Sequence, residues 1–206
     1  MLLWAGIAFI VAGIGCIAID RQAAHLLYDH VNEPFFRFLD ATTHWAKAGH
    51  WLIAAVAAYG GAEAAMHFWG ADPDLHLAAK AALAFIASLG AGSVVLHGIK
   101  LLLGRRRPRD DMEMGLYGFL PFSFDLQYNS FPSGHALTIM CVAAIACCIW
   151  PHLALLWFAI AFWLAVTRAL LTAHFLSDVF VGAGIGLIAA REVVLNFFPT
   201  LPPSWF

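Results

Sequence analysis

Charged residues are scarce in this sequence. Asp, Glu, Lys and Arg make up only 12% of its 206 residues, about half of the share that soluble domains usually carry. The few charges also cluster, so that long stretches carry none. A soluble fold of this length needs more polar surface, and we therefore expect a membrane protein.

Cysteines are also few, and their spacing excludes two common roles. All four lie in apolar stretches, and the adjacent pair matches neither a zinc site nor a disulfide framework. We expect small hydrophobic side chains, facing lipid or neighbouring helices, at Cys16, Cys141, Cys147 and Cys148. The net charge is −2, whereas a nucleic-acid binder usually carries an excess of basic residues. We therefore expect no nucleic-acid partner.

Hydrophobic runs dominate what remains. Hydrophobic residues make up 62% of the chain, and the mean hydropathy is +0.79. Because a bilayer span takes about 20 mainly apolar residues and backbone groups must pair within the bilayer, we predict an all-α, polytopic membrane helical bundle of about six spans, forming one domain over residues 1–206. The first run lacks a basic n-region and a cleavage site, and we expect it to be retained as a span. The predicted spans cover 2–19, 51–69, 78–103, 134–150, 153–173 and 176–196.

Two longer polar segments lie between these spans. Residues 20–50 hold a helix start at Asn32-Glu33-Pro34, which predicts a short interfacial helix with an apolar side formed by Phe35, Phe38, Leu39 and Trp45. Residues 104–133 are rich in Gly, Pro, Asp and Arg, which predicts an irregular loop. On the last span, Gly182 and Gly186 form a GxxxG pattern that indicates close helix packing.

The unusual polar residues fall at four span ends that share one membrane face. If six spans alternate in direction, the ends of the third and fifth spans meet the starts of the fourth and sixth. Ionisable residues at membrane depth are costly and usually functional, so this convergence predicts a site. The residues at these four places are Lys100 and Arg107; Ser133, Gly134 and His135; Thr167 and Arg168; and His174 and Asp178.

The chemistry of this set suits a phosphate group. Three cations and the Gly and Ser donors match phosphate oxygens, and Lys100 and Arg107, seven residues apart, would share a face of a continuous helix. His174 and Asp178 have i, i+4 spacing, and a hydrogen bond between them would leave the other ring nitrogen as a nucleophile. His135 remains to protonate the leaving alkoxide. Phosphoryl transfer depends on charge neutralisation, so we expect protein cations to replace a metal ion, with no cofactor.

At these residues the sequence resembles the type 2 phosphatidic acid phosphatase superfamily, membrane enzymes related to vanadium haloperoxidases. The family's Lys-x6-Arg-Pro signature is matched from Lys100 to Pro108, and its Pro-Ser-Gly-His signature from Pro132 to His135. Its Ser-Arg-x5-His-x3-Asp signature is matched from Thr167 to Asp178, with Thr in place of the usual Ser.

The resemblance implies a six-helix phosphatase that acts on lipid phosphates. It implies His174 as the nucleophile that forms a phosphohistidine, Asp178 as its partner and His135 as the general acid. It also implies a phosphate-binding set of Lys100, Arg107, Ser133, Gly134 and Arg168. We expect a lipid phosphate and the bilayer as partners; the sequence leaves the oligomeric state and the identity of the lipid open.

Three alternatives remain open on the sequence alone. The first is a phosphotransferase, in which another hydroxyl group accepts the phosphoryl group from His174. The second is a transporter or channel, although the charges lie at span ends rather than at the midplane. The third is a metallohydrolase in which His135, His174 and Asp178 bind zinc, although three neighbouring cations would repel the ion.

Two indications of membrane orientation disagree. Only Lys80 and Arg191 lie opposite the site, which leaves nine of the eleven Lys and Arg residues on the site face; the positive-inside rule then points the site toward the cytoplasm. The resemblance to bacterial enzymes points it toward the periplasm. We follow the resemblance and expect a multi-pass protein of the bacterial inner (plasma) membrane with a periplasmic active site.

Other residues near the signatures have simpler interpretations. We interpret Arg105, Arg106 and Arg109 as a solvated basic cluster at the membrane boundary, with attraction of anionic headgroups as the alternative. We interpret His97, one turn before Lys100, as a helix contact, with a position at the border of the site as the alternative. Within residues 109–131 we expect a lipid-recognition or lid region that contains Phe119, Phe122, Phe124 and Tyr128.

Overall fold

The computed structural model describes residues 1–122 and 125–206; Phe124 of the expected lid region lies outside them. The described residues are mainly helical and form no named strand. The helices are α1 (Leu2–Cys16), α2 (Asp20–His30), α3 (Glu33–Thr43), η1 (His44–Ala46), α4 (Ala48–Trp69), α5 (Pro73–Leu103), α6 (Pro108–Met114), η2 (Leu126–Tyr128), α7 (Gly134–Ile149), η3 (Pro151–Leu153), α8 (Ala154–Leu170) and α9 (Leu176–Phe197).

Six of these helices coincide with the six predicted apolar runs. The largest difference is at α5, which begins at Pro73 rather than at 78. The side chain of Asp72 accepts hydrogen bonds from the backbone N–H groups of Asp74 (2.8 Å) and Leu75 (3.3 Å), so it caps this helix. This cap places the start of α5 five residues before the start of the predicted span.

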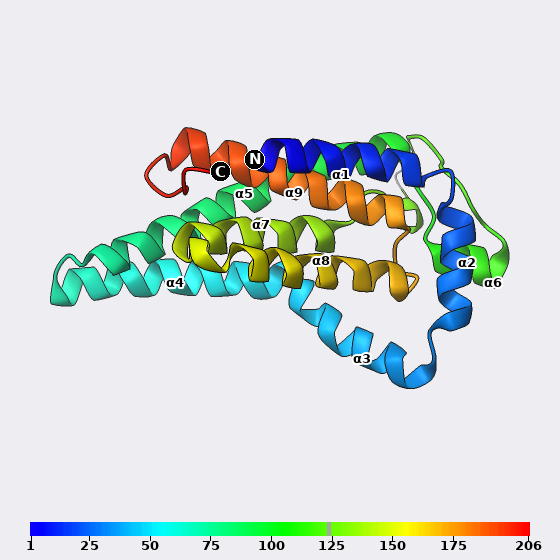
Figure 1. The fold of residues 1–206 in the computed structure, drawn as a ribbon, viewed down its shortest axis with the longest axis horizontal. Coiled ribbons are helices and arrows are strands. Elements are labelled where there is room, and N and C mark those ends of the chain that lie inside the picture. Colours follow the sequence, from blue (N-terminus) through cyan, green and yellow to red (C-terminus); the bar gives the residue numbers. More distant parts are fainter. Residues whose placement is uncertain (123–124) are drawn as a thin grey trace.

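The long helices run side by side, and α9 packs against α1, α5 and α7 (Figure 1). Close approach of α9 to α7 requires Gly182 and Gly186: a Cβ atom at either position would collide with the backbone oxygen of Ser133 or Leu137, respectively. The predicted packing role of the GxxxG pattern is confirmed. It holds the start of α7 against the start of α9.

The outer surface of the bundle is apolar, as a membrane protein requires. Large hydrophobic side chains such as Leu155, Val94 and Ile53 are 72–86% exposed, whereas soluble monomers rarely expose wide apolar patches. By length and composition alone, α5 and the stretch Pro151–Leu170 can each cross a membrane, and the α1–α2 pair, bent by 87°, is a third candidate. The membrane bundle is confirmed, and the count of six spans stays a prediction.

One end of the bundle carries the helices α2, α3 and α6 (Figure 1). The side chain of Asn32 accepts a hydrogen bond from the N–H of Phe35 at 3.0 Å, which confirms the helix start. Residues 20–50 do not form one interfacial helix: they contain α2, α3, the short η1 and the first residues of α4. The guanidinium of Arg21 binds both carboxylate oxygens of Asp111 at 2.9 Å, which ties α2 to α6.

The expected irregular loop over 104–133 contains a helix. The chain leaves α5 at Gly104, where φ is +47°, and α6 begins at Pro108. The N–H of Arg107 donates to the carboxylate of Asp110 at 3.3 Å, and Pro108 occupies the first turn, where its missing N–H is tolerated. The loop prediction was therefore wrong for residues 108–114. The two signals of this helix start, Pro108 and Asp110, are present in the sequence.

Candidate active site

A polar pocket lies at the end of the bundle where α5 stops and α7 begins. Its volume is about 360 Å³. Segments far apart in the sequence border it, as the alternating helix directions predict. The structure brings six of the predicted site residues to this pocket: Lys100, Arg107, Gly134, His135, Arg168 and His174.

The pocket cations are held in place by neighbouring oxygen atoms. Lys100 donates to the backbone oxygen of Asn129, and Arg107 donates to its side-chain oxygen at 3.0 Å. Arg168 donates to the hydroxyl of Thr43 at 3.1 Å. Burial, together with the charge of Arg109, lowers the pKa of Arg107 from its usual value. A set of cations crowded in this way favours a bound anion.

Lys100 and Arg107 do not share a helix face. The α5 helix ends at Leu103, and Arg107 is the residue that precedes α6. Both still border the pocket because the chain turns back at Gly104. The expectation of a continuous helix was wrong in its geometry.

His174 lies in the short connection between α8 and α9 and is 5% exposed. Its Nδ1 atom is 3.5 Å from Oδ2 of Asp178 and 3.4 Å from Oγ of Ser130. Ser130 donates its own proton to Asp178, so both neighbours can accept a proton from Nδ1, and the lone pair is left on Nε2. Burial lowers the pKa of His174 to about 4, and the ring is therefore neutral near pH 7.

Asp178 lies behind His174, is fully buried and does not line the pocket. Its Oδ2 atom accepts from Ser130 Oγ at 2.5 Å and from the N–H of Phe175 at 2.8 Å. The contact with His174 does not join adjacent turns of a helix, as the i, i+4 spacing predicted, because α9 begins only at Leu176. Asp178 instead caps α9 and receives the histidine from the preceding connection.

Two signature hydroxyls point elsewhere. Ser133 is buried and precedes α7, where its Oγ accepts from the N–H of Ala136 at 3.5 Å. Thr167 is also buried and donates to the backbone oxygen of Leu164 at 2.7 Å. Neither side chain lines the pocket. Phosphate binding by Ser133 stays a prediction, whereas its capping role is visible.

The sequence did not predict Lys47 and Asn129 at this site, but both line the pocket. His97 lines it too, which agrees with the alternative to its predicted helix contact. Lys47 comes from the segment before α4, which no signature covers. Only the three-dimensional contact reveals it, because exposed lysines before membrane helices are common.

The interpretation of Arg105 as solvated was wrong. Arg105 is 0% exposed, while Arg106 is half-buried and Arg109 is exposed. Arg105 pairs with Asp178 at 2.7 Å and with Asp20 at 2.8 Å. The local sequence does not distinguish these three arginines. Asp20 could have been noticed, since a carboxylate directly after an apolar run is costly at membrane depth.

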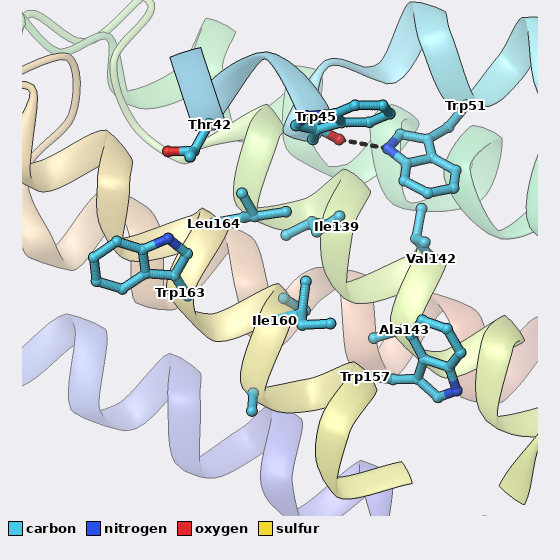
Figure 2. A pocket seen from close by; sticks show the side chains of 12 residues that line it. Thr42, Trp45, Trp51, Ile139, Val142, Ala143, Trp157, Ile160, Trp163 and Leu164 are labelled. Atoms are coloured by element: carbon cyan, nitrogen blue, oxygen red, sulfur yellow. Dashed lines mark hydrogen bonds between the residues drawn. The ribbon is translucent and has the colours of Figure 1, made fainter. Parts of the chain in front are cut away.

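A larger cavity of about 550 Å³ lies beside η1, between α7 and α8. Figure 2 shows the four tryptophans among its mainly apolar lining: Trp45, Trp51, Trp157 and Trp163. Trp51 donates from Nε1 to the backbone oxygen of Trp45 at 2.6 Å, which fixes η1 at its edge (Figure 2). None of its lining residues is ionisable. This cavity therefore lacks the cationic side chains that a phosphate group would need.

The zinc alternative requires His135, His174 and Asp178 to surround one ion. Within residues 1–122 and 125–206, no three His, Cys, Asp or Glu side chains are arranged to hold a metal ion. These three residues therefore do not form the ligand set of that alternative. The four cysteines are free, and Cys141, Cys147 and Cys148 are buried, as predicted.

The chain is similar to two curated bacterial proteins. It is 34% identical over 142 residues to the lipid A 1-phosphatase of Rhizobium etli, which covers 61% of this chain and 60% of the relative. It is 34% identical over 140 residues to the lipid A 1-phosphatase of Rhizobium johnstonii, covering 61% and 57%. The chain thus spans about three fifths of the length of these relatives.

Two crystal structures share the fold at low sequence identity. The PAP2-type phosphatidylglycerolphosphate phosphatase of Bacillus subtilis superimposes with a TM-score of 0.64 at 18% identity, covering 98% of both chains. LpxE of Aquifex aeolicus superimposes with a TM-score of 0.58 at 17% identity, covering 86% of this chain and 96% of that one.

The family comparison covers the pocket itself. The sequence model of the PAP2 superfamily matches residues 81–201. This range is more than half of the chain and includes every residue of the three signatures, whereas Lys47 and Asp20 lie outside it. The chain belongs to the PAP2 superfamily.

Proposed function

We propose that this protein is a metal-independent membrane phosphatase that removes a phosphate group from a lipid through a phosphohistidine at His174. One observation carries the proposal. The neutral, buried ring of His174 borders a pocket that also holds Lys47, Lys100, Arg107 and Arg168. A nucleophile facing an anion site is the arrangement that phosphoryl transfer needs.

In the first step, Nε2 of His174 attacks phosphorus, and the bond between phosphorus and the lipid oxygen breaks. His135, which borders the same pocket, donates a proton to the leaving oxygen. The ring of His174 gains positive charge as the nitrogen–phosphorus bond forms, and Asp178 behind it balances that charge. The pocket cations neutralise the phosphoryl oxygens, the role that metal ions have in other phosphoryl-transfer enzymes.

In the second step, water attacks phosphorus, and the nitrogen–phosphorus bond breaks. His135 takes a proton from that water, so that both histidines return to their starting forms when phosphate leaves. If an alcohol replaces water, the same chemistry gives a phosphotransferase. Because water and an alcohol would react by the same mechanism, only the products distinguish a phosphatase from a phosphotransferase: inorganic phosphate in the first case and a phosphorylated alcohol in the second.

The proposed substrate is a lipid with a terminal phosphate exposed at the membrane surface. Similarity to two lipid A 1-phosphatases makes the 1-phosphate of lipid A the first compound to test. We further propose that the pocket faces the periplasm of the bacterial inner membrane, where such a headgroup would be accessible. The apolar surface of the bundle keeps the lipid chains in the bilayer while the phosphate enters the pocket.

The direct test is phosphate release by the purified protein from a panel of lipid phosphates. The panel contains lipid A, phosphatidic acid, phosphatidylglycerol phosphate and a polyprenyl diphosphate, with and without candidate alcohol acceptors. We expect release that vanadate inhibits and a chelator leaves unchanged, and no release by His174→Ala. Undiminished turnover by folded His174→Ala would end the proposal.

A further inference from the structure

The guanidinium of Arg105 is enclosed between two acidic groups and two aromatic rings. Its Nη1 atom donates to Oδ1 of Asp178 and to Oγ of Ser177, both at 2.7 Å, and its Nη2 atom donates to Oδ2 of Asp20 at 2.8 Å. The rings of Phe175 and Phe119 lie 4.0 Å and 4.6 Å from the guanidinium carbon. A lysine has no planar fork that could meet these partners together.

The backbone of Arg105 also organises the site. Its N–H donates to the oxygen of Tyr128 at 2.8 Å, and its oxygen accepts from the N–H of Ser130 at 3.0 Å. This pairing places Ser130 Oγ at 2.5 Å from Asp178 and 3.4 Å from Nδ1 of His174. Arg105 therefore holds both neighbours of that nitrogen: Asp178 through its side chain and Ser130 through its main chain.

Asp20 anchors the opposite side of the guanidinium. It lies at the junction of α1 and α2 and is 0% exposed. Its Oδ1 accepts from the N–H of Ser177 at 3.0 Å, and its Oδ2 accepts from the Ser177 hydroxyl and from Arg105. Asp20 thus fixes the first turn of α9 and the direction of the guanidinium together.

We propose that Arg105 and Asp20 are positioning residues that lock Asp178 against His174. The inference rests on the proposed phosphohistidine chemistry. Arg105 and Asp178 are both 0% exposed and form an ion pair at 2.7 Å, and removing one partner of a buried pair leaves an unpaired charge that is strongly unfavourable. Without Arg105, Asp178 would therefore leave the position in which its Oδ2 atom lies 3.5 Å from Nδ1 of His174.

The charges also suit the reaction. Two carboxylates, Asp20 and Asp178, surround one guanidinium, so the buried network carries one excess negative charge if all three groups are ionised. That charge lies behind His174, where positive charge develops when the ring bonds to phosphorus. Arg105 thus fixes the position of the Asp178 carboxylate without cancelling the negative charge of the network. That charge can then stabilise the phosphorylated ring of His174.

The test compares Arg105→Lys, Asp20→Asn and Ser130→Ala with the control Arg109→Lys, whose side chain is exposed. We expect each of the three variants to lower kcat by about 10- to 100-fold, with KM changed much less, since the phosphate-binding cations remain. The control, Arg109→Lys, should have the same kcat and KM as the wild type. Unchanged kcat in Asp20→Asn or Ser130→Ala would overturn the proposal even if Arg105→Lys fails to fold.

A double-mutant cycle separates positioning from a general structural role. If Arg105 acts through Asp178, Arg105→Lys should cost little more kcat in an Asp178→Asn background. Independent, multiplying losses would contradict the inference. Active His174→Ala would instead defeat the proposed function, whereas inactive His174→Ala beside fully active Arg105→Lys would defeat only the positioning role.

Discussion

The imidazole of His174 is almost fully enclosed, and its protonation follows from that burial. Burial lowers the pKa of His174 to about 4, below the usual value near 6.5. The folded state therefore binds fewer protons than the unfolded state between these two values. The free energy of unfolding therefore decreases as the pH falls from about 6.5 toward 4, and the ring of His174 is neutral above that range.

In an NMR titration, we predict that the His174 resonance shifts with a midpoint near pH 4. The resonance is assigned by its absence from His174→Gln. The thermal midpoint of the wild type should also fall more steeply than that of His174→Gln between pH 6.5 and 4. A titration midpoint near 6.5 would mean that the ring is not shielded as the structure indicates.

Lys47 adds a cation at the exposed rim of the pocket. Because exposed charge interactions contribute about 0.2–1 kcal/mol, we expect Lys47→Met to raise KM for a lipid phosphate by about 2- to 5-fold, with kcat nearly unchanged. High salt should reduce the difference. Lys80→Met, which removes a lysine from the start of α5, is the matched control, and an equal rise in KM there would exclude a specific role for Lys47.

At the scale of helices, the contact between α9 and α7 positions the Pro-Ser-Gly-His segment. A methyl group at Gly182 would collide with the backbone of Ser133, which cannot rotate away. We expect Gly182→Ala to destabilise the protein by about 1–3 kcal/mol, the usual cost of overpacking, and to lower kcat. A lower thermal midpoint in detergent measures the first effect.

The control for this substitution is Gly90→Ala in α5, where an added Cβ atom meets nothing within 4 Å. Alanine favours helices over glycine, so this variant should be as stable as the wild type or slightly more so. Equal destabilisation by both substitutions would show that the close contact at Gly182 has no special importance.

The elements that sequence reasoning predicted well are those with strong local signals. Apolar runs of helical length gave the six long helices, and alternating helix direction brought Lys100, Arg107, His135 and His174 to one pocket. The α6 helix was missed although Pro108 and Asp110 mark its start, because the surrounding glycine and proline content favoured a loop.

The contacts that could not be predicted from the sequence depend on packing between distant segments. Burial of Arg105 requires Asp20, 85 residues earlier, and Asp178, 73 residues later. Nothing in the local sequence distinguishes Arg105 from exposed Arg109. Lys47 likewise reaches the pocket only because the start of α4 lies beside α5 and α7, and helical periodicity does not predict that placement.

At the scale of the whole molecule, the orientation in the membrane decides which lipids can reach the pocket. Met114, the last residue of α6, is 57% exposed, and His76 is exposed near the start of α5; Figure 1 shows α6 and the start of α5 at opposite ends of the bundle. The buried native thiols of Cys141, Cys147 and Cys148 should react slowly. For a periplasmic site, Met114→Cys should react with an impermeant maleimide added outside the inner membrane, in spheroplasts, and His76→Cys should not. The reverse pattern would place the site in the cytoplasm.

If His174 is the nucleophile, its ring carries the phosphoryl group during turnover. The most direct measurement is rapid quenching at alkaline pH with a lipid labelled in its phosphate, followed by mass spectrometry of the peptides. We predict an acid-labile phosphoryl group on His174 that forms within one turnover and is absent from His174→Gln. Turnover that proceeds while His174 stays unmodified, or label found on another residue, would exclude His174 as the nucleophile.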